Sequence, residues 1–223
     1  MMVTDFLRSE ICRVGRSLFE RGYVHATAGN ISARLPANQG GGILITPTDA
    51  CLGFLDPDSL AWVDDAGEQR AGDRASKTVA LHRRIYAADP DAHCVLHTHS
   101  SHLVRLTLQG VWTIEDILPP ITPYFVMKVG HVPLMPYRRP GDPATADAVA
   151  AGITQATARG KPIRAAMLDR LGPLVWADSP GSAMAVLEEL EETARLWLAC
   201  QPRPEPLDDS RIDDLRRHSG AFW

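Results

Sequence analysis

Apolar residues recur along this chain at two spacings, one typical of helices and the other typical of strands. Between residues 4 and 21 they recur every three or four positions, so they line one side of a predicted helix that Gly22 ends. Between residues 31 and 35 apolar and polar residues alternate, which predicts a strand. The chain therefore begins with a helix and continues into a sheet.

The same two patterns predict the remaining elements. Strands are expected at residues 43–46, 60–63, 94–99, 132–137, 164–168 and 174–176. Helices are expected at residues 76–88, 101–109, 142–160 and 179–199, with Ser76, Asp142 and Ser179 at their starts. Short turns join several strands as hairpins, so we expect a single α/β domain over residues 1–200, with a mainly antiparallel central sheet flanked by helices. Residues 201–223 make up a polar, proline-rich tail.

Composition excludes several classes of protein. The chain has 223 residues, of which 45% are apolar and 22% are charged, and its formal net charge is −4. It carries no basic stripe, so nucleic-acid binding is not expected. No apolar stretch approaches the ~20 residues of a membrane span, and the charged N-terminus does not resemble a signal peptide. The sequence also lacks the glycine-rich loops that bind nucleotides.

Cysteine usage indicates a reducing compartment. Cys12, Cys51, Cys94 and Cys200 lie far apart in the sequence, without the close paired spacing of a cysteine zinc site. Disulfide frameworks are typical of secreted proteins, so we expect reduced thiols and a cytoplasmic location.

Two histidines mark the end of the predicted strand at residues 94–99. His97 and His99 are two positions apart, and such residues of a strand point to the same face. Both imidazoles then leave the sheet on one side, where they can bind one metal ion, and neutral imidazole suits zinc and its first-row neighbours. The structural alternative is a pair of histidines that hydrogen-bond backbone groups or water at a strand end.

Four motifs occur in a fixed order along the chain. They are Ala-Gly-Asn-Ile-Ser at 28–32, Ile-Thr-Pro-Thr at 45–48, Ser-Lys-Thr at 76–78 followed by His82, and His-Thr-His at 97–99. With them the chain resembles the class II aldolase/adducin family over nearly its whole length, to about Ala199. Two further segments, 122–127 and 139–142, are similar to the branch of this family that decarboxylates 3-oxo-tetronate 4-phosphates.

The resemblance implies a three-layer fold assembled as a homotetramer with active sites between subunits. It implies a divalent metal on His97 and His99, usually zinc, with manganese as the second choice. It also implies a pocket for the phosphate of a phosphorylated sugar acid. Carried over position by position, this pocket falls on the following residues: Gly29, Asn30, Thr48, Ser76 and Lys77.

The chemistry of these residues suits a phosphate. Gly29 allows the backbone to approach a ligand closely, and Asn30 offers an amide donor. Ser76 lies at the start of a predicted helix, where free N–H groups attract an anion, and Lys77 adds a positive charge. Each residue also has an ordinary interpretation, as part of a turn, a helix cap or a surface side chain.

Two positions depart from the family pattern. The family usually has a proton-transferring glutamate where this chain has Thr78, and a third histidine ligand where this chain has Leu171. A threonine hydroxyl has too high a pKa to serve as a general base near neutral pH, and leucine cannot bind a metal. His131 is the first candidate for a substitute ligand, followed by His102 and His25.

These departures favour decarboxylation over aldol cleavage. A 3-oxo acid loses carbon dioxide without deprotonation of a hydroxyl, whereas retro-aldol cleavage begins with that step. We therefore expect metal-dependent decarboxylation of a 3-oxo-tetronate 4-phosphate to dihydroxyacetone phosphate and carbon dioxide. Lys77 or Arg170 would stabilise the enediolate, and Tyr124 would donate a proton across a subunit interface. The alternatives are a sugar-phosphate aldolase of the fuculose-phosphate type with a relocated base, and a non-catalytic adducin-like scaffold.

Overall fold

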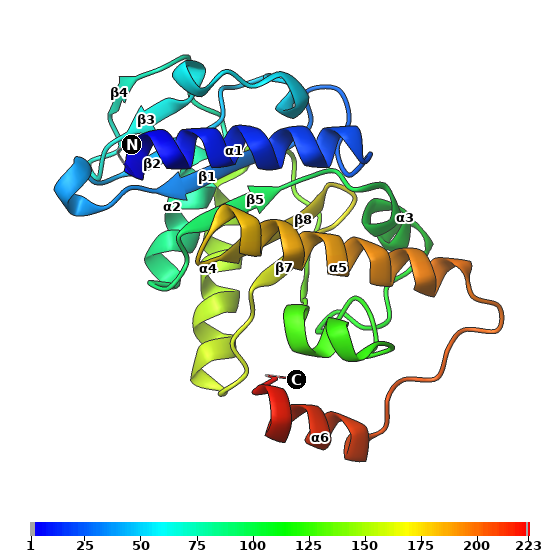
Figure 1. Cartoon of the computed structure of the whole chain (residues 1–223). Helices are drawn as coiled ribbons and strands as arrows, with labels where there is room; N and C mark the ends of the chain where they lie inside the picture. Colours follow the sequence, from blue (N-terminus) through cyan, green and yellow to red (C-terminus); the bar gives the residue numbers. More distant parts are fainter. Residues whose placement is uncertain (1–2, 222) are drawn as a thin grey trace.

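An eight-stranded sheet lies between two layers of helices in the computed structural model, which describes residues 3–221 and 223 (Figure 1). The strands are β1 (Asn30–Arg34), β2 (Ile43–Ile45), β3 (Ala61–Val63), β4 (Gln69–Ala71), β5 (Cys94–His97), β6 (Leu134–Met135), β7 (Ala165–Leu168) and β8 (Gly172–Ala177). Their order is β4-β3-β2-β1-β5-β8-β7-β6, and every neighbouring pair except β6–β7 is antiparallel. The predicted α/β architecture with a mainly antiparallel sheet is confirmed.

Most of the predicted helices form within a few residues of their expected bounds. They are α1 (Val3–Glu20), α2 (Val79–Ala88), α3 (Ser101–Gln109), α4 (Pro143–Ala158), α5 (Pro180–Ala199) and α6 (Asp209–Ser219), with 3₁₀ turns at Ala37–Gln39, Leu52–Phe54 and Pro57–Ser59 and a π-helical turn η4 at Phe125–Val129. Asp142 and Ser179 cap α4 and α5 through their side chains, as predicted. No helix within the described residues is long and apolar enough to cross a membrane.

Alternation along the central strands gives the sheet two buried faces. In β5, Cys94 and Leu96 pack in the cluster formed with α1, α3 and α5, whereas Val95 packs in the cluster formed with α2 and α4. In β8, Val175 packs in the first of these clusters and Trp176 in the second. Neither face of these strands is left to solvent, so β5 and β8 are mainly apolar.

The direction of the strands brings several chain segments to one edge of the sheet. β2, β5, β6 and β7 run in one direction and end at this edge, whereas β1 and β8 run the opposite way and begin there. This edge therefore brings together Asn30 at the start of β1, His97 at the end of β5, and the loops that carry Thr48 and residues 136–142. A functional site at this edge follows from the topology alone.

Some local expectations prove wrong, for identifiable reasons. Ser76 is not a helix cap, because its N–H bonds the Thr46 carbonyl at 3.2 Å and keeps the chain extended, so α2 begins only at Val79. The strand expected at 132–137 shrinks to β6, since Pro133 and Pro136 bound it and proline has no N–H for a sheet. Strand β4 was not anticipated, because all three of its residues are exposed and lack an alternating pattern.

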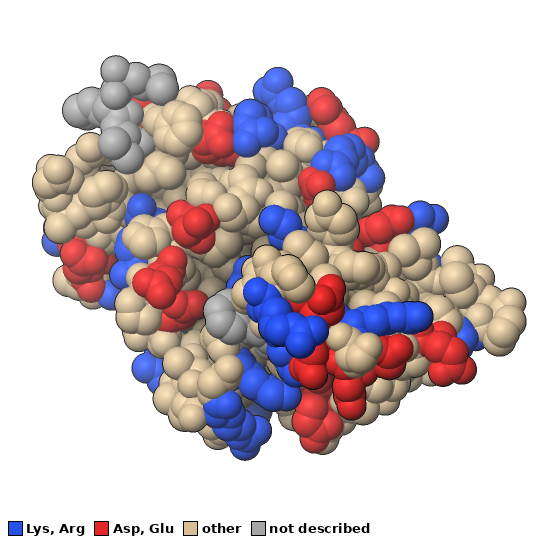
Figure 2. All heavy atoms as spheres, turned by 60° about the horizontal axis from the view of Figure 1, so that its bottom comes forward, with Lys and Arg blue, Asp and Glu red and all other residues tan. Residues whose placement is uncertain are grey.

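The C-terminal tail contains a helix that the sequence pattern does not predict. Helix α6 is capped by the side chain of Asp208 and carries ion pairs between residues three apart, such as Arg216 with Asp213. Ile212 is the one residue of this helix that the structure buries, so local charge pairing replaces the apolar stripe. On the side of the molecule that Figure 2 presents, acidic and basic side chains lie intermingled.

Replacing Leu96 with alanine should lower the free energy of unfolding by about 2–5 kcal/mol, because the side chain is fully buried in a central strand and the change leaves a cavity. Urea titration of the two proteins measures this difference. The matched control is Leu108→Ala, where 57% of the leucine is exposed and a change within about 0.5 kcal/mol is expected. Equal losses at both positions would contradict the placement of Leu96 in the core.

Candidate active site

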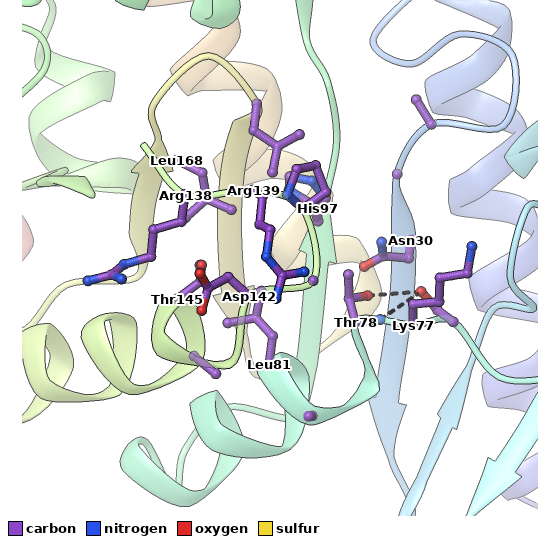
Figure 3. Close-up of a pocket in the computed structure, with 18 of the residues that line it drawn as sticks. Asn30, Lys77, Thr78, Leu81, His97, Arg138, Arg139, Asp142, Thr145 and Leu168 are labelled. Carbon is purple, nitrogen blue, oxygen red and sulfur yellow. Dashed lines mark hydrogen bonds between the residues drawn. The ribbon is translucent and has the colours of Figure 1, made fainter. Parts of the chain in front are cut away.

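A cavity of about 450 Å³ lies at the sheet edge where these strands begin and end (Figure 3). Residues from all of the converging segments line it, from 27–30 at the start of β1 to Leu168, Asp169 and Leu171 at the end of β7. The cavity brings together the two predicted metal ligands and the residues predicted for phosphate binding: Gly29, Asn30, Thr48, Ser76, Lys77, His97 and His99. Their roles as ligands and phosphate contacts stay predictions.

The two histidines lie side by side at the end of β5, and their ring centroids are 5.1 Å apart. The Nδ1 of His97 donates to the Pro173 carbonyl oxygen at 2.8 Å, which leaves the Nε2 lone pair of a neutral ring available. A backbone contact of this kind fixes the orientation and tautomer of a metal-binding histidine. The two rings therefore lie together at one cavity as predicted, although the strand expected to reach residue 99 ends at His97.

Both rings are held in the neutral form. Burial, and then the proximity of His99, lower the pKa of His97 from 6.5 to about 4, although the bond to Pro173 opposes this shift. Burial and the nearby His25 also lower the pKa of His99. Metal ions bind unprotonated imidazole, so this electrostatic environment keeps both nitrogen donors available at neutral pH.

Gly29 has a structural role in addition to the one predicted. Its φ is +86°, and a Cβ at this position would lie 2.7 Å from the His97 carbonyl oxygen. Glycine is therefore required so that the chain can pass close to β5, rather than only to admit a ligand. The result is that Asn30, the next residue, enters β1 directly opposite His97.

The residues before α2 form a polar wall of the cavity. The hydroxyls of Ser76 and Thr78 lie 2.9 Å apart, and the Ser76 hydroxyl also accepts from the Thr78 N–H at 3.3 Å (Figure 3). Lys77 is exposed, with its Nζ 3.9 Å from a carboxylate oxygen of Asp49. Because both partners are well exposed, this ion pair is weak and leaves the ammonium available to an anion.

The sequence analysis missed the arginines of the loop after β6. Arg138 and Arg139 both line the cavity. In Figure 3 the guanidinium of Arg139 points into the space between His97 and Asn30, whereas Arg138 points away from it. The sequence identified segment 139–142 only as a family motif, because a single sequence does not show which strand ends this loop lies beside.

Two of the predicted catalytic groups lie elsewhere. Tyr124 is 61% exposed beside η4 and lines a separate surface hollow with Tyr23 and Lys128. Arg170 is exposed after β7 and does not line the cavity. Neither residue contacts the histidine pair of its own chain, so a role for Tyr124 requires a second subunit.

The substitute ligands named from the sequence do not complete the metal site within the chain. His131 donates its Nδ1–H to the Asp116 carboxylate at 2.8 Å and stacks on Trp223, and His102 is bonded to Glu191. Leu171 lines the cavity, as its place in the family pattern suggested. Among the described residues, no group of three histidine, cysteine, aspartate or glutamate side chains is placed to hold a metal ion.

The cavity and its motifs agree with the known proteins that this chain matches. Residues 9–198 match the family model for the Class II Aldolase and Adducin N-terminal domain. The chain belongs to the class II aldolase and adducin family. The family predicted from the four ordered motifs is therefore confirmed.

Relatives within this family resemble the chain over its full length. A protein of Cupriavidus necator named 3-oxo-tetronate 4-phosphate decarboxylase is 52% identical over 100% of both chains. An Escherichia coli protein of the same name is 40% identical over 96% of this chain and 97% of its own length. The solved structure of YgbL from Klebsiella pneumoniae matches with a TM-score of 0.84 and 39% identity, over 97% of this chain and 100% of that one.

Acidification below neutral pH should destabilise the fold. In the unfolded chain His82 and His97 take up protons near pH 6.5, whereas burial lowers their folded-state pKa values to about 3 and about 4. Each ring therefore removes about 1.4 kcal/mol from the free energy of unfolding per pH unit below 6.5, until the folded ring itself takes up a proton near its own pKa. Urea titrations between neutral pH and about pH 5 measure the slope.

The variant His82→Gln should flatten this slope, because it removes one of the two buried rings. Replacement of the exposed His93 by glutamine is the matched control and should leave the slope unchanged. A slope that His82→Gln does not alter would show that this ring takes up its proton equally in both states.

Proposed function

We propose that this chain is a metal-dependent carboxy-lyase that converts a 3-oxo-tetronate 4-phosphate into dihydroxyacetone phosphate and carbon dioxide. The observation that carries the proposal is one cavity that unites two neutral histidines with several donors for anions. Full-length relatives at 40–52% identity bear the name of this activity. The proposed class is a lyase of carbon–carbon bonds.

The donor set in the cavity suits a divalent cation. His97 presents an unprotonated Nε2, and His99 lies beside it as a second neutral imidazole. Two nitrogen ligands leave coordination positions open for substrate oxygens, as catalytic metal sites require. Zinc, or alternatively manganese, held by these rings would supply a Lewis acid for the ketone of the substrate.

The residues of the chain supply the remaining chemistry. Loss of carbon dioxide breaks the bond between the carboxyl carbon and its neighbour, and the electron pair of that bond passes to the ketone to give an enediolate. Lys77 and Arg139 line the cavity as cations that stabilise this negative charge. The ammonium of Lys77 is the proposed proton donor within the chain, and Tyr124 is the proposed donor from a neighbouring subunit.

The environment of position 78 supports decarboxylation over aldol cleavage. Thr78 offers a hydroxyl that is hydrogen-bonded to Ser76, and no carboxylate stands at this position to remove a proton. Retro-aldol cleavage needs such a base at its first step, whereas decarboxylation needs only charge stabilisation followed by protonation. The fuculose-phosphate type of reaction is thus less compatible with this site.

Arg139 suits the second anionic group of the proposed substrate. A 3-oxo-tetronate 4-phosphate carries a phosphate at one end and a carboxylate at the other. Asn30, Ser76 and Lys77 are proposed to bind the phosphate, and in Figure 3 Arg139 projects from the opposite wall of the cavity. A guanidinium binds a carboxylate through two parallel hydrogen bonds, so Arg139 is proposed to bind and orient this group.

We propose a homotetramer located in the cytoplasm as the working state. Several large apolar side chains are exposed on the chain, among them Trp112 and Ile114, as expected where a subunit contact covers them. The exposure of Tyr124 fits the same interpretation, because its hydroxyl can then reach the cavity of a neighbour.

Replacing His97 with alanine should abolish both metal binding and decarboxylation. The wild-type protein should hold about one zinc or manganese ion per chain and release carbon dioxide from a 3-oxo-tetronate 4-phosphate. In the variant, metal content should fall close to zero and the rate should fall about 100-fold or more, because the ketone loses its electron acceptor. Elemental analysis and a coupled assay for dihydroxyacetone phosphate measure the two effects.

The control is His93→Ala, since this histidine is exposed at a distance from the cavity lining. Full activity of a metal-free wild-type protein would contradict the metal part of the proposal. A wild-type protein that neither binds metal nor releases carbon dioxide would favour the scaffold alternative.

Replacing Arg139 with glutamine should weaken substrate use by about 10- to 100-fold in kcat/KM, because a charged hydrogen bond worth about 1.5–3 kcal/mol is lost. Inhibition by dihydroxyacetone phosphate should change little, since this product lacks the carboxylate. Arg138→Gln is the matched control and should have a small effect on both measurements. Equal weakening of substrate and product by Arg139→Gln would assign Arg139 to the phosphate instead.

A further inference from the structure

A chain of hydrogen bonds runs from the core of the protein to the wall of the cavity. The hydroxyls of Tyr86 and Ser32 lie 2.8 Å apart, and the Ser32 hydroxyl lies 2.7 Å from the Nδ1 of His82. The Nε2 of His82 lies 2.5 Å from the Oδ1 of Asn30. Asn30 is the only member of this series that lines the cavity, within the part of the chain that the structure describes.

The geometry of β1 explains how one ring joins two residues. Asn30 and Ser32 are two positions apart on the strand, so their side chains lie on the same face. His82, on the inner side of α2, lies against this face and contacts one residue with each ring nitrogen. Ser32 and His82 are fully buried, and Tyr86 and Asn30 are nearly so.

The series has a defined direction. Burial, and then the nearby His97, lower the pKa of His82 to about 3, so the ring is neutral and carries a single N–H. The Oδ1 of Asn30 can only accept, so the N–H is on Nε2. Nδ1 must then accept from Ser32, whose oxygen accepts from Tyr86. Every donor therefore points towards the cavity, and the amide nitrogen of Asn30 is the end of the series.

We propose that His82 is a positioning residue that fixes the side-chain amide of Asn30 with its N–H donors facing the phosphate of the substrate. The proposal rests on the proposed function for the identity of this ligand. An asparagine amide is nearly symmetric in shape, and its two orientations present either a donor or an acceptor. An acceptor facing a phosphate would repel it, so a fixed orientation increases affinity.

A double-mutant cycle on the full chain tests whether His82 acts through Asn30. Isothermal titration calorimetry measures the binding of inorganic phosphate and of dihydroxyacetone phosphate to four proteins: wild type, His82→Leu, Asn30→Ala and the double variant. Each single variant should bind about 10-fold more weakly, which corresponds to about 1.4 kcal/mol. The double variant should bind no more weakly than Asn30→Ala, because His82 has no amide left to position.

Two further variants separate positioning from folding. His82→Gln retains a side-chain N–H and should recover part of the lost affinity. Ser32→Ala leaves His82 in place but removes the hydroxyl that fixes which ring nitrogen carries the proton. It should therefore weaken phosphate binding in the wild-type background, and it should have no further effect in a chain that already carries Asn30→Ala. This second cycle tests the same proposal if His82→Leu does not fold. The matched control is His102→Leu, because His102 is hydrogen-bonded to Glu191 and does not line the cavity.

Additive effects in either cycle, or unchanged affinity in His82→Leu, would overturn the positioning role. A wild-type chain that does not bind phosphate would overturn it as well. These outcomes are separable from those of the proposed reaction, because the calorimetry needs no turnover. Non-additive phosphate binding in a chain that releases no carbon dioxide would leave the positioning role intact and reject the decarboxylase.

Discussion

The antiparallel register that places Asn30 opposite His97 is the contact from which the rest of the site follows. Gly29 permits it, because any side chain there would collide with the His97 carbonyl oxygen. Across this pair of strands the proposed metal ligand His97 and the proposed phosphate contact Asn30 become neighbours, although the sequence separates these two by more than sixty residues. The helices on both faces then bury the two strands and hold the register in place.

Burial gives the site its chemical character. A histidine in water is partly protonated near neutral pH, and a protonated ring binds no metal and cannot accept a hydrogen bond. Burial between the sheet and α2 lowers the pKa of His82, and burial within the sheet lowers that of His97, so one ring can orient an amide while the other offers a lone pair. The same burial lowers the free energy of unfolding in acid, because the unfolded chain takes up protons that the buried neutral rings do not.

The sequence was sufficient for those features that depend on short-range periodicity. The stripe on α1, the alternation in β1 and the short apolar run in β5 are local patterns, and they placed these elements and the histidine pair correctly. Ser76 was assigned to a helix cap because its bond to Thr46 depends on a pairing between distant segments. Arg139 and the link from His82 to Asn30 were missed for the same reason, since only the completed sheet brings these residues together.

The loop after β6 differs from the other cavity walls in how it is anchored. β6 pairs over two residues at the outer edge of the sheet, and the Asp142 cap then starts α4. His97 and Asn30 instead belong to the central strands β5 and β1, which are paired on both sides. Sequence change in 136–142 can therefore reshape what the cavity admits, including the contact proposed for Arg139, without disturbing His97 and Asn30. Natural or engineered substitutions in this loop can therefore change which acid the cavity binds.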